Sequence, residues 1–158
     1  MDRYSISLPV FCQCLSDTGV CEVRVDSDMV EKEALEQFAR YFKNEMRFDF
    51  IQYEARSHPK ECVGVLFTEN AMDVCTEDHL EMPTRCIGGG LFHKDGSRWV
   101  LMWIWIHPFF RNRGALSSRW RELCSLFGDF AIEGPLSHSM KAFVCKQSGT
   151  HQLVKLTQ

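Results

Sequence analysis

The most hydrophobic stretch of the chain runs from Arg98 to Ile106 and is apolar at both odd and even positions. A strand with two apolar faces is typically buried on both sides of its sheet. Residues 86–92 form a second apolar stretch, and the Asp95-Gly96 pair between the two is a strong signal for a β-hairpin. The pattern therefore predicts two antiparallel strands at the centre of the sheet.

Apolar positions three and four residues apart predict a first amphipathic helix. These positions are Leu35, Phe38, Phe42 and Met46. Asp28 and Glu31 have the spacing of a capping box, so we expect the helix to begin just after Asp28 and to end near Met46. Residues 20–25 alternate before this helix and residues 62–67 are apolar after it, which predicts a strand on each side.

Two segments around the central strands are rich in turn-forming residues. Residues 69–84 are polar and predict a surface loop, which is either a substrate lid or a plain connection. Gly88, Gly89 and Gly90 lie inside the first apolar stretch and indicate a bulge or a close approach of two backbones. Access of an acceptor to a narrow cleft is the alternative interpretation of these glycines.

A second amphipathic helix is predicted after the buried strand, and Gly128 ends it. Its apolar positions are Leu116, Trp120, Leu123 and Phe127, whereas Arg119, Arg121 and Glu122 fall on the opposite face. Residues 129–133 predict a further strand, and Ser137 is expected to cap a last helix. That helix would turn Met140, Phe143 and Val144 inward. No repeat or second core interrupts residues 1–158, so we expect a single domain.

The junction between the buried strand and the second helix has the composition of an anion-binding site. Pro108 ends the strand, and Gly114 stands where the first amides of the helix lack intrahelical acceptors. Such amides bind phosphate groups with the help of the helix dipole. Arg111 and Arg113 add positive charge. The alternative is an ordinary turn with solvated arginines.

The segment from Ile106 to Leu116 resembles motif A of the GNAT superfamily, the coenzyme A-dependent N-acetyltransferases. Arg111 and Gly114 match the Arg/Gln-x-x-Gly part of that motif. Leu116 departs from it, because the family has Gly or Ala there, and the larger side chain would crowd the backbone approach to the cofactor. The resemblance covers about residues 86–146, the expected cofactor-binding core. A weaker likeness in residues 128–144 is to the cohesin acetyltransferase branch.

The resemblance implies an α/β (α+β) fold, with a mixed, mostly antiparallel central sheet that is splayed at the cofactor strand and flanked by helices. It implies acetyl-CoA as cosubstrate, with the pyrophosphate on the loop amides and the thioester along the strand. The implied cofactor-binding residues are Trp105, Ile106, Arg111, Asn112, Arg113, Gly114, Ala115 and Leu116. The implied activity is that of an N-acetyltransferase acting on a primary amine, which is either a protein lysine or a small amine.

Attack of an amine on a thioester requires a base that removes a proton from nitrogen. Many GNAT enzymes carry an acid on the central strand or a tyrosine in the last helix, and this sequence has neither at those places. We expect Glu133, at the end of the neighbouring strand, to be the base, with a solvated or ion-paired carboxylate as the alternative. His107 and His138 are the next candidates, and Cys145 stands roughly where the tyrosine of the family would fall.

The charge and hydrophobicity of the chain argue against two classes of partner, nucleic acids and membranes. A formal net charge of −3 without a basic stripe argues against direct binding to nucleic acid. No apolar run approaches the roughly 20 residues that cross a bilayer, and residues 1–15 lack the pattern of a secretory signal. We therefore expect a soluble, cytoplasmic protein without membrane partners.

The chain contains 8 cysteines, most of which have the surroundings of structural residues. Cys12, Cys14 and Cys21 are the one candidate metal cluster, but their spacing is wrong for a zinc pair and no histidine follows closely. Without a secretory signal a disulfide framework is also not expected. The sequence thus predicts neither bound metal nor disulfides.

Two other functional classes remain open. One is a catalytically weak GNAT-fold module that binds acyl-CoA or a protein partner, which the missing strand acid and Leu116 favour. The other is a plain α/β domain whose arginine-rich loop recognises a phosphorylated ligand. Retention of coenzyme A by the purified protein would separate both GNAT possibilities from this last one.

Overall fold

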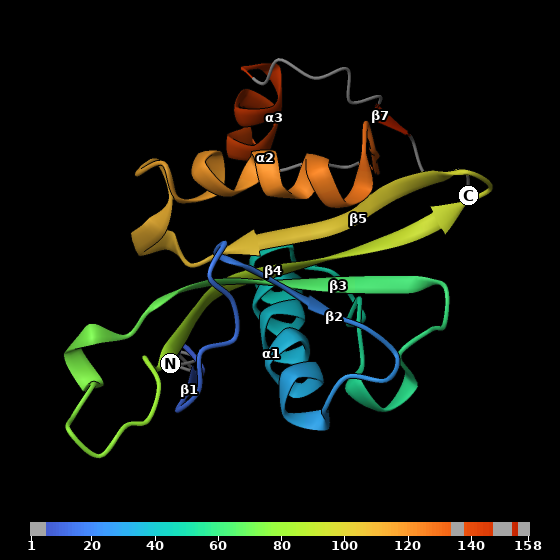
Figure 1. The fold of residues 1–158 in the computed structure, drawn as a ribbon. Helices are drawn as coiled ribbons and strands as arrows, with labels where there is room; N and C mark the ends of the chain where they lie inside the picture. Colours follow the sequence, from blue (N-terminus) through green and yellow to red (C-terminus); the bar gives the residue numbers. More distant parts are fainter. Residues whose placement is uncertain (1–5, 134–137, 147–152, 155–158) are drawn as a thin grey trace.

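One sheet lies between two helical layers (Figure 1). The computed structural model describes residues 6–133, 138–146 and 153–154, with the backbone alone for 138, 139, 145, 153 and 154. The strands are β1 (Val10–Phe11), β2 (Val20–Val23), β3 (Cys62–Asn70), β4 (Thr84–Asp95), β5 (Arg98–Ile106), β6 (Ala131–Glu133) and β7 (Leu153–Val154). The helices are α1 (Met29–Met46), α2 (Ala115–Phe127) and α3 (His138–Cys145), with short 3-10 helices η1 (Ala55–Ser57), η2 (Met72–Val74) and η3 (Pro108–Phe110).

Within the described residues, the strands pair in the order β2-β3-β4-β5-β6-β7, and β1 pairs with the start of β4. Pairing is antiparallel from β2 to β5 and parallel at β5–β6 and β6–β7. The predicted mixed, mostly antiparallel sheet with a central hairpin is therefore confirmed. The hairpin is longer than predicted, because Asp95 pairs with Arg98 and the turn contains Gly96 and Ser97 alone.

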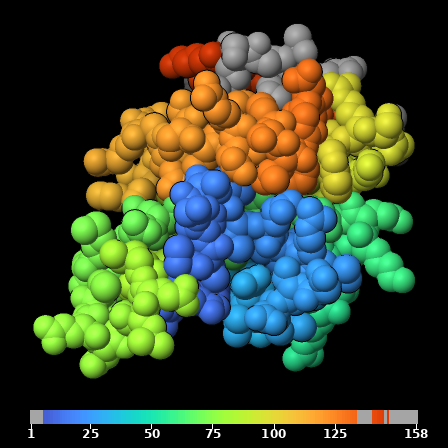
Figure 2. Space-filling view, in the orientation of Figure 1, coloured from blue at the N-terminus to red at the C-terminus, as the bar shows by residue number. Residues whose placement is uncertain are grey.

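The helices cover opposite faces of the sheet, α1 on one side and α2 with α3 on the other (Figure 1). On the α2 face, Phe92 stacks on Phe127 with ring centroids 3.9 Å apart. On the α1 face, Leu35 and Phe38 are fully buried against Trp105. Figure 2 shows α2, in orange, over the upper half of the molecule and the blue N-terminal segments below it. No helix in the described ranges is long and apolar enough to cross a bilayer.

β5 separates from β6 partway along its length. The two strands pair at Val100 with Ala131 and at Leu101 with Ile132. Met102 comes next and is bulged against β4, because the β4 register passes directly from Trp103 to Leu101. A bulge bends a strand and increases its twist at this point. Among the described residues β5 has no further pairing with β6, whose described part ends at Glu133. This is the part of the cofactor strand where the sequence resemblance implied a splay.

Glycines on β4 allow close packing of neighbouring backbones. A Cβ atom on Gly89 would lie 2.9 Å from the Val65 carbonyl oxygen and 3.0 Å from Leu35 Cδ1. Gly88 and Gly90 face the β5 backbone in the same way. The predicted close approach is confirmed, and the register shifts fall just outside the glycine run on both sides.

Several local expectations are corrected by the structure. Asp28 is the N-cap of α1 but makes no side-chain capping hydrogen bond, so the predicted capping box does not form. β1 was not expected, and its position follows from the hydrogen bond that the Cys86 N–H donates to the Pro9 carbonyl at 2.9 Å. The short strand β7 was not expected either. The predicted cap at Ser137 lies outside the described residues.

Arg119 also differs from its predicted place on the solvent face of α2. Its guanidinium group donates to the carbonyl oxygens of Gly19, Thr68 and Ala115 at 3.1, 2.5 and 2.7 Å. Burial lowers the pKa of this guanidinium below its ordinary value, and nearby Glu69 opposes the shift. The side chain therefore ties the first turn of α2 to the ends of β2 and β3.

Alkylation of the folded protein is expected to distinguish the exposed cysteines from the buried ones. Cys12, Cys14 and Cys75 are exposed, whereas Cys21 and Cys86 are buried. Burial raises the pKa of Cys86 to about 12 and that of Cys21 to about 11, so neither forms much reactive thiolate at pH 8. Iodoacetamide at that pH should label the exposed group first and the buried pair after denaturation, as measured by peptide mass spectrometry. Rapid labelling of Cys86 in the native protein would contradict this assignment.

Candidate functional site

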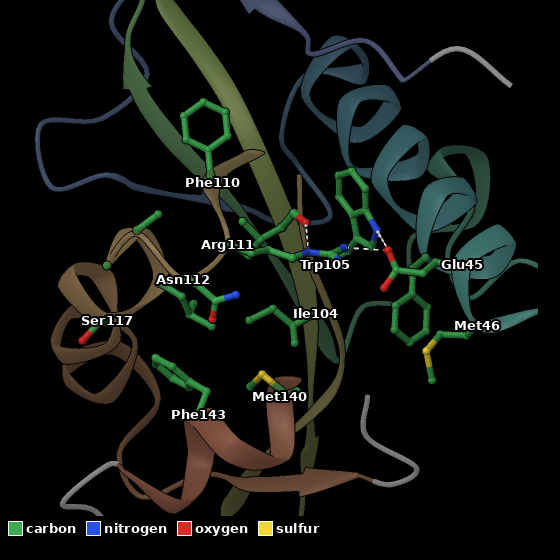
Figure 3. Close-up of a pocket in the computed structure, with 15 residues that line it drawn as sticks. Glu45, Met46, Ile104, Trp105, Phe110, Arg111, Asn112, Ser117, Met140 and Phe143 are labelled. Carbon is green, nitrogen blue, oxygen red and sulfur yellow. Dashed lines mark hydrogen bonds and ion pairs between the residues drawn. The ribbon is translucent and has the colours of Figure 1, made fainter. Parts of the chain in front are cut away.

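A pocket of about 160 Å³ opens where β5 leaves β6 (Figure 3). Three parts of the chain build it: the end of α1, the end of β5 with the loop that follows, and the facing sides of α2 and α3. The lining residues are Phe42, Glu45, Met46, Ile104, Trp105, Ile106, Phe110, Arg111, Asn112, Gly114, Ala115, Leu116, Ser117, Met140 and Phe143. The walls are mainly apolar, and the charged side chains among the lining residues are Glu45 and Arg111.

The end of β5 presents backbone groups to this pocket. The His107 N–H donates to the Ile87 carbonyl of β4 at 2.9 Å, and alternate residues of a strand direct their N–H and C=O groups to the same neighbour. Ile104 and Ile106 therefore direct theirs away from β4, into the splay. The sequence analysis assigned this role to Trp105 as well as Ile106, but the backbone groups of Trp105 face β4. An extended ligand with amide groups can pair with Ile104 and Ile106.

The start of α2 forms the other polar wall of the pocket. Gly114 is its N-cap with φ of 80°, and Asn112 precedes it with φ of 60°. The first intrahelical bond runs from the Ser118 N–H to the Gly114 carbonyl at 2.9 Å. Within the described residues, the N–H groups of Ala115, Leu116 and Ser117 have no acceptor. A Cβ atom on Gly114 would have no neighbour within 4 Å, so the space beside this residue is open.

Arg111 crosses the pocket and joins its two sides (Figure 3). Its Nε donates to the Ile106 carbonyl at 2.7 Å, and its Nη2 is 2.7 Å from Glu45 Oε1. The same Glu45 oxygen accepts a hydrogen bond from Trp105 Nε1 at 3.2 Å. The guanidinium carbon also lies 5.6 Å from the centroid of the Trp105 ring. The guanidinium group of Arg111, which was expected to attract an anion, is therefore paired with the carboxylate of Glu45 in this conformation.

Most of the residues that the resemblance assigned to the cofactor lie together in the lining of this pocket. Those in its lining are Trp105, Ile106, Arg111, Asn112, Gly114, Ala115 and Leu116. Arg113 is not a lining residue, and its guanidinium carbon lies 4.5 Å from the Phe109 ring centroid.

Of the expected catalytic residues whose side chains are described, Glu133 and His107 are not among the residues that line the pocket. Glu133 ends β6 at the root of the splay, and burial raises the pKa of its carboxyl group, an effect that His93 opposes. His107 begins the loop after β5 and accepts a hydrogen bond from the Phe109 N–H at 3.1 Å through Nδ1. Burial and the nearby Arg111 lower the pKa of His107. His138 and Cys145 are the first and last residues of α3, and their side chains lie outside the described part of the structure.

The sequence analysis missed the contribution of α1. Phe42, Glu45 and Met46 end this helix and reach the pocket from the opposite side of the sheet. Phe42 and Met46 were assigned to the core by their helical spacing. Nothing in the sequence indicated that Glu45 belongs to a site, because it is one of several charged residues on the polar face of an amphipathic helix. Among the residues that the structure describes, no group of three His, Cys, Asp or Glu side chains could hold a metal ion.

No protein-family model matches this sequence, and no curated protein matches it. Among solved structures, the fold is similar to the xEco2 acetyltransferase domain, which was solved bound to a conjugate of a lysine with CoA. The TM-score is 0.55 at 11% identity, over 88% of this chain and 93% of that one. A tetramutant of the BH1408 protein from Bacillus halodurans gives a TM-score of 0.46 at 12% identity, over 88% of this chain and 99% of that one. The likeness to the acetyltransferase domain shows that the chain has a GNAT-like fold, as its motif predicted.

Proposed function

We propose that this protein is an N-acetyltransferase that uses acetyl-CoA and transfers the acetyl group to a primary amine, with a protein lysine as the favoured acceptor. One observation carries the proposal: the backbone groups of Ile104 and Ile106 that face away from β4, and the amides at the start of α2 that have no acceptor among the described residues, line one pocket. An amide-containing arm attached to a pyrophosphate fits that pair of polar walls. The lysine–CoA conjugate of the neighbour xEco2 supports a lysine acceptor.

The residues present fit the cosubstrate chemically. The N–H groups of Ala115, Leu116 and Ser117 would donate to the pyrophosphate, assisted by the dipole of α2. The pantetheine amides would pair with Ile104 and Ile106, completing the interrupted sheet. Leu116 lines the pocket and narrows the approach to these amides, so we expect a weaker affinity than a small residue would give.

The transfer requires little covalent chemistry from the protein. The neutral amine nitrogen attacks the thioester carbonyl, the carbon–sulfur bond breaks, and CoA leaves as the thiolate. A backbone N–H of the splayed strand stabilises the developing oxyanion. The proton of the acceptor nitrogen goes to a base, and we assign this role to Glu133, because burial raises the pKa of its carboxyl group and so makes it a stronger base than an ordinary carboxylate. His107 and the residues of α3 are the remaining candidates.

A GNAT-fold module that binds acyl-CoA without efficient turnover is the second candidate. Two observations favour it: no acid lies on β5, and Arg111 is held by Glu45 and the Ile106 carbonyl. This candidate predicts cosubstrate binding without acetyl transfer.

Acetyl-CoA is expected to raise the melting temperature, because a ligand that binds the folded state alone stabilises it by mass action. At about a hundredfold excess over Kd the gain is about 2.7 kcal/mol, equivalent to roughly 5–10 °C for a domain of this size. Differential scanning fluorimetry with acetyl-CoA, with ATP as the control, measures the effect. An equal shift with both ligands would favour a general phosphate site instead. Turnover of lysine peptides and small amines then separates an enzyme from a binding module.

A further inference from the structure

Three groups surround the guanidinium of Arg111 at the α1 side of the pocket. Glu45 supplies a carboxylate (Figure 3), the Trp105 ring lies 5.6 Å from the guanidinium carbon, and Phe42 and Met46 are apolar residues in the lining of the same pocket. The exposed fractions of the Arg111 and Glu45 side chains are 28% and 34%. A carboxylate and an aromatic ring beside apolar walls form a binding site for an organic cation.

An alkylammonium group can interact with the same partners as Arg111, namely the Glu45 carboxylate and the Trp105 ring. Within the described part of the chain, Glu45 Oε1 accepts two hydrogen bonds and Oε2 has no partner, so the carboxylate can take a further donor. The hydrogen bond from Trp105 fixes the carboxylate beside the end of β5, next to the strand along which the cosubstrate is proposed to bind. A lysine side chain could place its methylenes along Phe42 and its nitrogen at Glu45.

We infer that Glu45 and Trp105 form the acceptor site for a primary alkylammonium, and that Arg111 occupies this site until the cosubstrate binds. Arg111 belongs to the loop that leads into α2, so a pyrophosphate at the α2 amides competes with Glu45 for the same guanidinium. Withdrawal of Arg111 frees both the carboxylate and the Ile106 carbonyl. The acceptor site therefore opens when the cosubstrate is in place, and binding is ordered. This inference rests on the proposed function.

If the cosubstrate competes with Glu45 for Arg111, removal of the Glu45 charge should increase the affinity for the cosubstrate. Glu45→Gln removes the partner that holds Arg111, so CoA should bind about two- to fivefold more tightly, the factor expected for loss of a partly exposed ion pair. The same variant should bind a lysine peptide more weakly, seen as a higher KM in steady-state transfer. Calorimetry with CoA measures the first effect. Glu33→Gln is the matched control, because Glu33 is exposed on the same helix and the change in net charge is equal.

A double-mutant cycle separates competition from simple charge repulsion. In an Arg111→Ala background, Glu45→Gln should no longer tighten CoA binding, because no guanidinium remains to be released. Tightening in both backgrounds would overturn the inference, and so would unchanged or weaker binding by Glu45→Gln alone. Those results leave the proposed function intact if wild type binds CoA. If neither wild type nor Glu45→Gln binds CoA, the proposed function and the inference both fail.

Discussion

Gly114→Glu is expected to abolish the stabilisation by acetyl-CoA. The new side chain would enter the open space in front of the α2 amides and bring a negative charge to the position proposed for the pyrophosphate. Loss of the amide contacts and the added repulsion should weaken binding by about a hundredfold or more, which at the same ligand concentration removes nearly all of the roughly 2.7 kcal/mol gain. Scanning fluorimetry and calorimetry with CoA measure the loss.

Gly114→Glu is also expected to lower the free energy of unfolding through backbone strain, so the control variant must have a similar strain. Gly114 has φ of 80°, where a side chain costs about 1–2 kcal/mol. Gly96 has φ of 64°, its Cβ direction is equally open, and it lies in the hairpin turn at the other end of β5. Gly96→Glu should therefore lower the melting temperature similarly and retain the response to acetyl-CoA. A folded Gly114→Glu variant with a wild-type response would exclude this loop as the cosubstrate site.

Glu133→Gln is expected to lower kcat for acetyl transfer by about a hundredfold or more while CoA affinity is retained, as for a missing base. Burial raises the pKa of Glu133, so in wild type the rate should rise with pH as this carboxyl group loses its proton. That limb of the pH–rate profile should disappear in the variant. Stopped-flow or steady-state assays across a pH series measure it.

The stability of the Glu133→Gln variant provides a second test of the raised pKa of Glu133. A carboxyl group with a raised folded pKa stabilises the fold at low pH, and this contribution is lost as pH rises through the folded pKa. At neutral pH Glu133→Gln should therefore unfold no more easily than wild type, although activity falls. Asp129→Asn, an exposed carboxylate just before β6, should change neither property. An unchanged pH–rate profile in Glu133→Gln would instead direct attention to Glu45 or His107.

The sequence predicted the fold well where side-chain periodicity is strong. The two-faced pattern of 98–106 identified the central strand, and the helical spacing around Trp120 identified α2 together with its end at Gly128. Both signals arise from burial, which acts on every residue of an element. The resemblance of the segment between these two elements to motif A of the GNAT superfamily then implied the GNAT-like fold.

Contacts between distant segments could not be predicted in the same way. Glu45 and Arg111 are far apart in the sequence, and their pairing depends on where α1 ends relative to β5. Arg119 has the spacing of a solvated residue, but the carbonyls that bind it come from β3 and the turn before β2. The short strand β1 is fixed by pairing with β4 and not by its own composition.

The splay of β5 has a consequence for how the protein avoids self-association. An unpaired strand edge is normally a template for intermolecular pairing, and proteins protect such edges with charge, bulges or covering elements. Here the open edge at Ile104 and Ile106 lies in the interior of a sheet, beneath the residues of α2 and α3 that line the same pocket. Within the described residues, α2 and α3 therefore cover this edge in the way that other proteins cover an exposed outer strand, so the same elements that line the pocket also guard against intermolecular pairing.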